Sequence, residues 1–388
     1  MNKRNVIFPL SSLLSCALLI ALCCSSVAAQ TQTQPQTEKP LTSQELVQLV
    51  YQLPQHPERR DVVVEEIRRR GLGFELTNGM RSLVASKSGN DALLRRTLEE
   101  AERRRENPAA SARPDEAQAR DVLEKTRTAT RAALGAMPDF IVKQLIARQY
   151  AFGTTKNWQP LDHLTVAVSY RESEGGERYK VLAVNGVPTA TAEAQERSNY
   201  EQESGSSSTG EFVTLLKELF SDEAKTQFQA VDTDVIREHR AIIYEYEIKL
   251  EDSQQTLLYR GKGSDTQVAR VGSRGRVWVD RENFRVLRLE NVATDIPVGF
   301  PITAAANTVD YDWVTIAEKK YLLPVSATVE MTSMAPVKSF DPREGRAVER
   351  VEIVQTHNEI RFRSYQKFGT EVKLLEDDDF PAEPPKKP

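Results

Sequence analysis

The residues that could do chemistry are few and widely spaced. The chain has four histidines, His56, His163, His239 and His357. None stands in a spacing such as His-x3-His or His-Glu-x-x-His, which would bind a metal, and no Gly-x-Ser-x-Gly nucleophile motif is present. His163 and His357 fall in strand-like segments, where we interpret them as polar residues on a sheet face. We therefore predict no catalytic residue, no metal and no cofactor, and we do not expect an enzyme.

Two Asp-x-Asp pairs are the next candidates for a site. Asp232 with Asp234, and Asp310 with Asp312, each place two carboxylates on one side of a strand or loop and could hold a hard cation. We prefer the alternative that they are solvated strand or turn residues. Residues 205–210 precede a helix and could offer backbone amides to an anion. They lack the lysine and the spacing of a phosphate-binding loop, so we favour a flexible loop.

Arginines cluster between residues 68 and 105, and the clusters have two interpretations. They could form a patch for acidic lipid headgroups or nucleic acid. Glutamates are interleaved with them, so we favour a solvated helix face with balanced charge. The clusters contain Arg68, Arg69, Arg70, Arg95, Arg96, Arg103, Arg104 and Arg105, and the acids are Glu65, Glu66, Glu99, Glu100 and Glu102. Because the formal net charge is −4 over 388 residues, we do not expect a nucleic-acid-binding protein.

The first 29 residues have the organisation of a signal peptide. Lys3 and Arg4 precede an apolar run over residues 6–24, and the small residues 27–29 precede a cleavage site before Gln30. We therefore predict export to the periplasm or the extracellular space. A retained membrane anchor is the alternative, which we disfavour because no basic stop-transfer flank follows.

All the cysteines lie in this segment. They are Cys16, Cys23 and Cys24, so the mature chain would hold no disulfide and no cysteine-bound zinc. Residues 13–16 faintly resemble a lipoprotein box. Cleavage there would leave an apolar run exposed, so lipidation of Cys16 is the less favoured alternative. No other run of about 18 apolar residues occurs, and we predict no transmembrane segment after cleavage.

Composition divides the remaining chain into five parts. We predict a flexible Gln-, Thr- and Pro-rich leader, a small helical module, an Ala/Pro-rich linker, a large sheet domain and a disordered acidic tail. In order, these parts span residues 30–40, 41–106, 107–114, 115–375 and 376–388.

Helix signals define the module over residues 41–106. Thr42 with Glu45 has the spacing of a capping box, and Thr77 and Asn90 are further N-cap candidates. Gly71 follows an apolar stripe and is a natural residue for a helix C-terminus. We expect four short helices here. A further helix should run over residues 115–137 and end before Pro138.

From residue 139 onward the hydrophobic period changes to two. Residues 140–150 alternate as a long strand does, and residues 275–290 form two such runs around a short Asp/Asn-containing connection, the pattern of an antiparallel hairpin. We expect Trp278, Phe284 and Val286 to share one face of that hairpin. Similar runs predict about ten strands between residues 140 and 368.

Three stretches of the sheet domain carry a family resemblance. They are Leu134-Gly135-Ala136-Met137-Pro138-Asp139-Phe140, the hairpin that contains Gly275-Arg276-Val277-Trp278-Val279-Asp280, and Tyr321-Leu322-Leu323-Pro324. Over residues 115–375 this pattern resembles the outer-membrane lipoprotein carrier and receptor superfamily (LolA/LolB-like). The resemblance implies an α+β fold in which an open antiparallel β-barrel wraps helices around an apolar cavity for acyl chains.

A curved sheet of this size must bury one face, and helices that cover it incompletely would leave an apolar cavity. On the residues alone we prefer a filled core, and a ligand cavity is the alternative. Its wall would comprise Phe140, Val166, Phe212, Leu216, Phe220, Tyr244, Tyr246, Trp278, Phe284, Val286 and Trp313. Residues 198–220 would form a lid.

With the resemblance, our leading hypothesis is an exported, non-enzymatic bacterial envelope protein that binds or carries a lipid or the acyl chains of a lipoprotein. The second hypothesis is an interaction protein of the envelope that docks a protein partner through residues 41–106. The third hypothesis is an exported hydrolase. We disfavour it because the sequence shows no set of nucleophile, base and acid.

Overall fold

The structure is a computed structural model that describes residues 39–109, 111–171, 176–189, 214–260, 266–341 and 346–368. The predicted signal peptide, residues 205–210, Phe212 and the predicted tail lie outside these ranges. The described residues from Pro40 onward form one compact unit of mixed helix and sheet. The predicted boundary at residues 107–114 stays a prediction.

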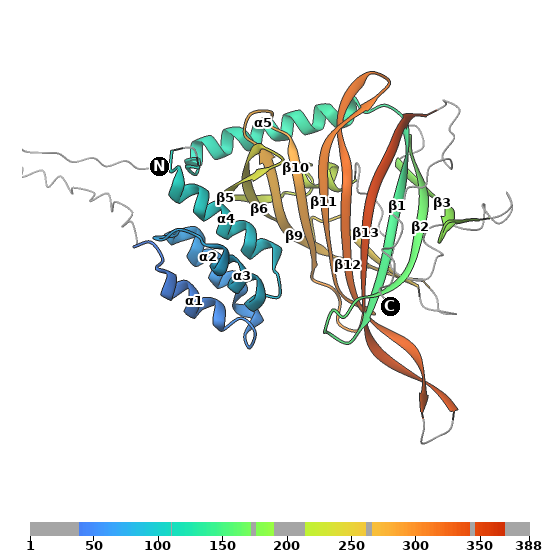
Figure 1. Ribbon diagram of the computed structural model, residues 1–388. Coiled ribbons are helices and arrows are strands. Elements are labelled where there is room, and N and C mark those ends of the chain that lie inside the picture. Colours follow the sequence, from blue (N-terminus) through green and yellow to red (C-terminus); the bar gives the residue numbers. More distant parts are fainter. Residues whose placement is uncertain are drawn as a thin grey trace, which may run out of the picture. The chain divides into compact units, whose positions relative to one another are not determined.

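Residues 41–106, the predicted helical module, form four α-helices that pack around their own apolar core (Figure 1). The helices are α1 (Ser43–Tyr51), α2 (Arg60–Arg70), α3 (Asn78–Lys87) and α4 (Ala92–Glu106), with a 3-10 turn η1 (Pro57–Arg59). The predicted capping box at Thr42 is present, and Thr77 caps α3. Gly71 ends α2 with a φ of 68°, which glycine adopts without strain. Asp91 rather than Asn90 caps α4.

Two further helices belong to the sheet domain, α5 (Glu116–Gly135) and α7 (Thr214–Leu219). Asp115 caps α5 by accepting a hydrogen bond from the amide of Gln118. Within the described chain, no helix has both the length and the hydropathy needed to cross a membrane.

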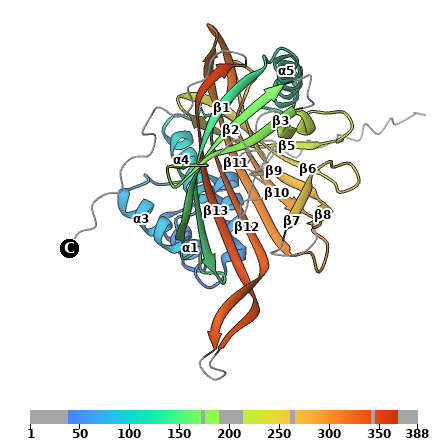
Figure 2. The ribbon, with the colours of Figure 1, turned by 90° about the vertical axis from the view of Figure 1, so that its right-hand side faces the viewer.

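The strands form a large antiparallel sheet and a separate hairpin (Figures 1 and 2). The large sheet has 11 strands in the order β4-β3-β2-β1-β13-β12-β11-β10-β9-β6-β5. These are β1 (Phe140–Phe152), β2 (Gln159–Arg171), β3 (Gly176–Val184), β4 (Val187–Pro188), β5 (Gln227–Ile236), β6 (His239–Ile248), β9 (Gly272–Asp280), β10 (Val286–Thr294), β11 (Ile302–Ile316), β12 (Lys319–Asp341) and β13 (Arg346–Lys367). The separate hairpin joins β7 (Thr256–Arg260) to β8 (Thr266–Arg270).

The end strands β4 and β5 are not paired with each other, so the large sheet is not closed. The sequence predicted most of its strands and missed β5. A bulge between Ala230 and Asp232 interrupts the alternation of β5, which removes the period-two pattern of a strand. At their far ends β12 and β13 pair with each other from Met334–Ile353 to Asp341–Arg346, and this ribbon extends beyond the neighbouring strands (Figure 1).

The predicted hairpin is β9–β10, and a carboxylate organises its turn. Asp280 accepts hydrogen bonds from the amides of Glu282 and Asn283 at 2.8 and 3.0 Å, and from the Asn283 side chain at 3.0 Å. Phe284 follows in the left-handed region with a φ of 55°. Asp280 thus supplies the local hydrogen bonds that this type of turn requires.

The prediction that Trp278 and Val286 share a face was wrong. Val279 pairs with Val286 and Trp278 with Arg288, so a bulge lies between Val286 and Arg288. The extra residue shifts the alternation of β10 by one. Val286 therefore packs in the core with Val279, while Trp278 packs in a second core on the opposite face.

Gly275 lets β9 pass beneath a tyrosine from the neighbouring strand. Tyr246 of β6 lies directly opposite Gly275, and its hydroxyl lies 3.1 Å from the carbonyl oxygen of Glu290 and 2.9 Å from Asn291 Oδ1. A Cβ atom on Gly275 would lie 1.8 Å from that same Glu290 oxygen. Burial raises the pKa of Tyr246 well above its ordinary value, so its hydroxyl stays protonated.

We predict that Gly275→Ala destabilises the protein by about 3 kcal/mol or more, because the added methyl group forces β9 away from β10. Urea unfolding followed by circular dichroism measures this. Gly135→Ala is the matched control, since nothing lies within 4 Å of the added Cβ and alanine suits a helix end. Equal stability of Gly275→Ala and wild type would contradict the geometry.

Candidate functional site

One face of the large sheet carries the main apolar core, and we call it the inner face. Helices α5 and α7 pack on it through Ala119, Leu216 and Phe220. The hydroxyl of Tyr244 donates to the carbonyl oxygen of Ala119 at 2.8 Å, which fixes α5 against β6. Arg131 of α5 donates to the carbonyl oxygen of Phe220 at 2.7 Å, so the two helices are also joined to each other.

Seven of the eleven predicted wall residues lie in this inner-face core. They are Phe140, Val166, Leu216, Phe220, Tyr244, Tyr246 and Val286. The period-two pattern located the five strand residues, because one buried face sets the alternation. Leu216 and Phe220 were predicted from the apolar stripe of an amphipathic helix instead.

The other predicted wall residues do not join that core. Trp278 is fully buried on the opposite, outer face. Phe284 lies in the β9–β10 turn with the ammonium of Lys125 5.1 Å from its ring centroid. Trp313 is 42% exposed, and Phe212 lies outside the described residues. The structure therefore does not place the predicted wall on a single surface.

Apolar side chains at the margin of the inner-face core remain partly exposed. They come from α5 and the connection after it, from α7 and from five strands, and comprise Val122, Leu123, Leu134, Met137, Tyr179, Val184, Leu215, Phe228, Ala230, Val314, Tyr321, Leu322 and Tyr365. Complete cover by helices would bury these side chains. In the described part of the chain, the inner face thus keeps an apolar margin that water reaches.

The inner face also holds buried polar atoms without a protein partner. Gln144 lies between Val142 and Ile146 along β1 and is fully buried. Among the described residues, neither its Oε1 nor its Nε2 has a hydrogen-bond partner. Ser273 Oγ, Asn307 Oδ1 and Thr356 Oγ1 are buried and unpartnered in the same way. By strand alternation all four side chains belong to the inner face. An unsatisfied buried polar group costs about 1–3 kcal/mol, so these atoms call for water or a ligand.

The outer face carries a buried ion cluster where the helical module meets β5. The Asp232 carboxylate is 2% exposed and lies 2.5 Å from Arg104 Nη2 and 3.2 Å from Arg68 Nε. The Arg68 side chain is 1% exposed. Arg113, in the predicted linker, reaches the same carboxylate at 3.6 Å. Three arginines from three chain segments therefore share one aspartate.

Asp234 also contributes to the contact between the helical module and the sheet. Its Oδ1 lies 2.8 Å from Arg103 Nη2, and its Oδ2 accepts a hydrogen bond from Trp278 Nε1 at 3.0 Å. A further pair joins Arg96 of α4 to Glu290 of β10. These contacts join α4 to β5, β9 and β10.

The preference for solvated arginines and solvated aspartates was therefore wrong for Arg68, Asp232 and Asp234. Arg68 and Asp232 are buried against each other, and Asp234 is buried against Trp278. The bulge in β5 causes this, because it turns Asp232 and Asp234 toward the helical module while Ala230 packs with the inner-face core. The arginine side chains satisfy these carboxylates, which removes the reason to expect a cation between them.

The two aspartates of the second Asp-x-Asp pair also form ion pairs with arginines. Asp310 forms a two-point pair with Arg288 at 2.8 and 3.0 Å, and Asp312 lies 3.2 Å from Arg237 Nε. Among the residues that the structure describes, no group of three His, Cys, Asp or Glu side chains could hold a metal.

We predict that Asp232→Asn destabilises the protein by about 3 kcal/mol, because it removes a buried counter-charge from Arg68 and from partly buried Arg104. Asp121→Asn is the control, since Asp121 forms an exposed i, i+4 pair with Lys125 and should cost less than about 1 kcal/mol. Urea unfolding measures both. A loss no larger than that of the control would contradict a buried, essential pairing.

His357 lies in a charged cluster on a sheet surface, as the sequence predicted for a polar strand residue. Its Nδ1 lies 3.3 Å from Glu330 Oε1 and its Nε2 lies 3.5 Å from Glu359 Oε1. The hydrogen bond with Glu330 raises the pKa of His357. The same bond, with help from Lys156, lowers the pKa of Glu330 to about 2.

We predict that Glu330→Gln lowers the pKa of His357 toward its ordinary value of about 6.5, as measured by NMR titration. Since folding raises this pKa, the stabilisation is complete below about pH 6.5 and is lost as pH rises through the folded pKa. The stability difference between wild type and variant should therefore shrink at alkaline pH. Lys156→Gln is the control, because it removes the other ion pair of Glu330 and leaves the pair with His357 in place. An unchanged His357 pKa in Glu330→Gln would exclude the pairing.

Comparisons with known proteins add little to this geometry. No family model matches the chain, and no curated protein matches it. A crystal structure of a DUF1329 family protein from Desulfovibrio piger is similar, with 11% sequence identity and a TM-score of 0.28 over 66% of this chain and 97% of that one. A likeness at this level carries no argument about function, and the resemblance to the lipoprotein carrier superfamily stays a prediction.

Proposed function

We propose that this chain is an exported, non-enzymatic envelope protein that binds or carries an apolar ligand, such as a lipid or the acyl chains of a lipoprotein. The observation that supports this most directly is the partly exposed apolar margin of the inner face. The description of the unclosed sheet as an open barrel around α5 and α7 belongs to the same proposal.

The margin is chemically suited to an acyl chain. Its side chains are aliphatic, aromatic or methionine, and they pack against the buried apolar core. A chain that removes about 200 Å² of apolar surface from water gains about 5 kcal/mol before the cost of association. That amount is enough for reversible binding of the kind a carrier needs.

The unpartnered polar atoms of the inner face support an amphipathic ligand rather than a plain hydrocarbon. Gln144 can both donate and accept a hydrogen bond, and Asn307 Oδ1 can accept one. Ester or amide groups at the head of an acyl chain present matching donors and acceptors. Ligand groups, or water that they hold, would remove the cost of leaving these atoms unsatisfied.

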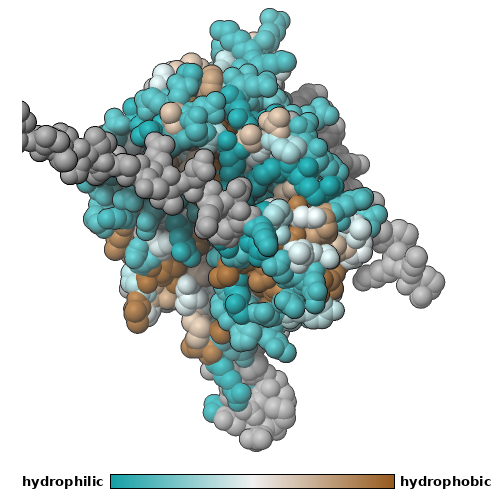
Figure 3. All heavy atoms as spheres, turned by 90° about the vertical axis from the view of Figure 1, so that its left-hand side faces the viewer, coloured by the Kyte–Doolittle hydropathy of each residue, from teal (hydrophilic) through white to brown (hydrophobic). Residues whose placement is uncertain are grey.

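The alternative function is docking of a protein partner through residues 41–106. The structure limits it, because Arg68, Arg103 and Arg104 of the module are committed to the sheet. A partner would have to use other surfaces of the module. Figure 3 views this side of the molecule, which is largely hydrophilic with hydrophobic residues gathered mainly in the lower half.

The test is to purify the full exported chain, extract it with organic solvent and analyse the extract for lipid by mass spectrometry. A fluorescent fatty acid is titrated in parallel. We expect co-purified lipid and a saturable signal. Leu322→Glu places a charge in the apolar margin and should weaken binding at least about tenfold.

Val298→Glu is the matched control, because Val298 is fully exposed and lies outside the margin. It should leave binding unchanged. Neither co-purified lipid nor a saturable signal from the wild type would reject the carrier function. Equal binding by Leu322→Glu and wild type would show that any ligand binds elsewhere.

A further inference from the structure

A pocket lined by arginines lies on the outer face, opposite the apolar margin. It has a volume of about 360 Å³ and is formed by α4, the end of β5 with the turn that follows it, and β10. Its lining consists of Arg95, Arg96, Glu99, Arg103, Asp234, Val235, Ile236, Arg237 and Arg288. Five arginines and two acids line it, so positive groups dominate the surface that a ligand would meet.

Carboxylates outside the lining hold two of these arginines in place. Asp310 binds Nε and Nη2 of Arg288, and Glu290 binds Nη2 of Arg96. Both guanidinium groups also lie within 6 Å of the ring centroid of buried Trp278. The side chains are thus oriented before any ligand arrives, which lowers the entropic cost of binding.

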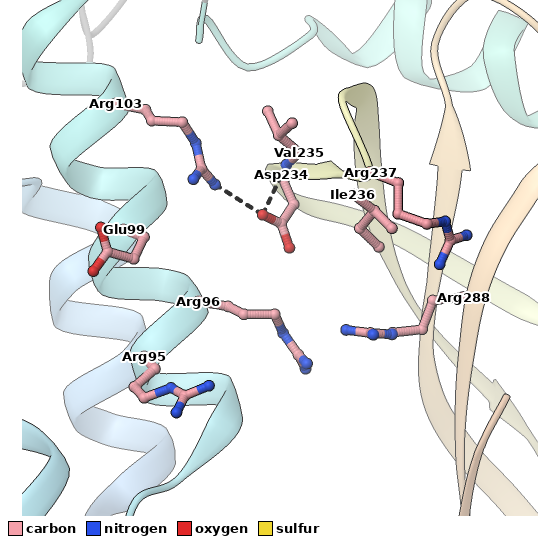
Figure 4. A pocket seen from close by; sticks show the side chains of 9 residues that line it. All are labelled: Arg95, Arg96, Glu99, Arg103, Asp234, Val235, Ile236, Arg237 and Arg288. Carbon is pink, nitrogen blue, oxygen red and sulfur yellow. Dashed lines mark hydrogen bonds and ion pairs between the residues drawn. The ribbon is translucent and has the colours of Figure 1, made fainter. Parts of the chain in front are cut away.

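These fixed arginines keep hydrogen-bond donors for the pocket. Figure 4 shows Arg96 and Arg288 reaching toward each other across the hollow. Among the described residues, Arg96 Nε is buried without a partner. Arg95, at the exposed side, donates from Nη1 to Asn90 at 3.1 Å, which leaves its other donors available.

We propose that this pocket binds a phosphate monoester, with Arg96 and Arg288 on either side of the phosphate and Arg95 at the entrance. A phosphate between the two guanidinium groups would accept a charge-assisted hydrogen bond from each. Planar guanidinium donors match phosphate oxygens. The volume, near the lower end of ligand pockets, exceeds that of phosphate alone and leaves room for an attached organic group.

The phosphate group could belong to a soluble metabolite or to a lipid headgroup. The probes are inorganic phosphate, glycerol 3-phosphate, and phosphatidylcholine vesicles with or without phosphatidic acid, all at one ionic strength because such binding is salt-dependent. Calorimetry should show saturable binding of glycerol 3-phosphate. Additional, phosphatidic-acid-dependent binding to vesicles would assign the group to a lipid, and its absence would assign it to a soluble ester.

Arg96→Gln should weaken glycerol 3-phosphate binding at least about tenfold and Arg95→Gln about three- to tenfold, as expected for loss of charged hydrogen bonds. Arg120→Gln is the control, because Arg120 is 71% exposed on α5 and lies outside the pocket; its binding should match the wild type. Arg96 also pairs with Glu290, so circular dichroism checks that Arg96→Gln is folded. Arg95→Gln tests the pocket without removing an ion pair to the sheet.

No saturable binding of inorganic phosphate or glycerol 3-phosphate at about 10 mM, a weak limit for a specific site, would overturn the proposal. Equal binding by Arg95→Gln, Arg96→Gln and wild type would overturn it as well. Because Leu322 and Arg96 belong to opposite faces, loss of fatty-acid binding and loss of phosphate binding are separate results.

Discussion

A carboxylate removed from water needs counter-charges and hydrogen bonds, and Asp232 obtains them from three arginines. Arg68 and Arg104 approach it from the helical module and Arg113 from the segment that follows. Because the attraction between opposite charges strengthens as water is excluded, separating these elements would expose or strand several charges at once. The contact between the helical module and the outer face of the sheet is therefore specified chiefly by charge, with the small apolar core around Trp278 beside it.

That constraint gives the two faces of the sheet different chemistry. On the outer face, charged side chains form ion pairs with one another. The arginine pocket lies where some guanidinium groups keep hydrogen-bond donors that these pairs do not use. On the inner face, α5 and α7 cover a continuous apolar core but leave its margin partly exposed. A single sheet thereby offers an apolar surface and an anion-binding pocket that do not overlap, and a molecule with both a lipid-like and a phosphate part would have to contact both faces.

Sequence patterns located the strands well and their faces less well. Alternation found β1, β6, β9 and β11 because each has a face that must avoid water. It failed at β5, where a bulge beside Asp232 turns acidic residues toward the helical module on the outer face, and at β10, where a bulge after Val286 separates that residue from Trp278. A bulge inserts one residue into the ladder and is stabilised by the neighbouring strand, so it leaves no signal within the strand itself.

Features whose partners lie within a few residues can be predicted from the sequence alone. The caps at Thr42, Thr77 and Asp115, the end of α2 at Gly71 and the Asp280 turn all depend on hydrogen bonds or dihedral angles that short segments set alone. Which charges are buried could be seen only in the folded chain. Arg68 and Asp232 are 164 positions apart by their numbers, and a helix with interleaved arginines and glutamates looks the same whether it faces water or aspartates. Their burial depends on long-range packing, which no local pattern encodes.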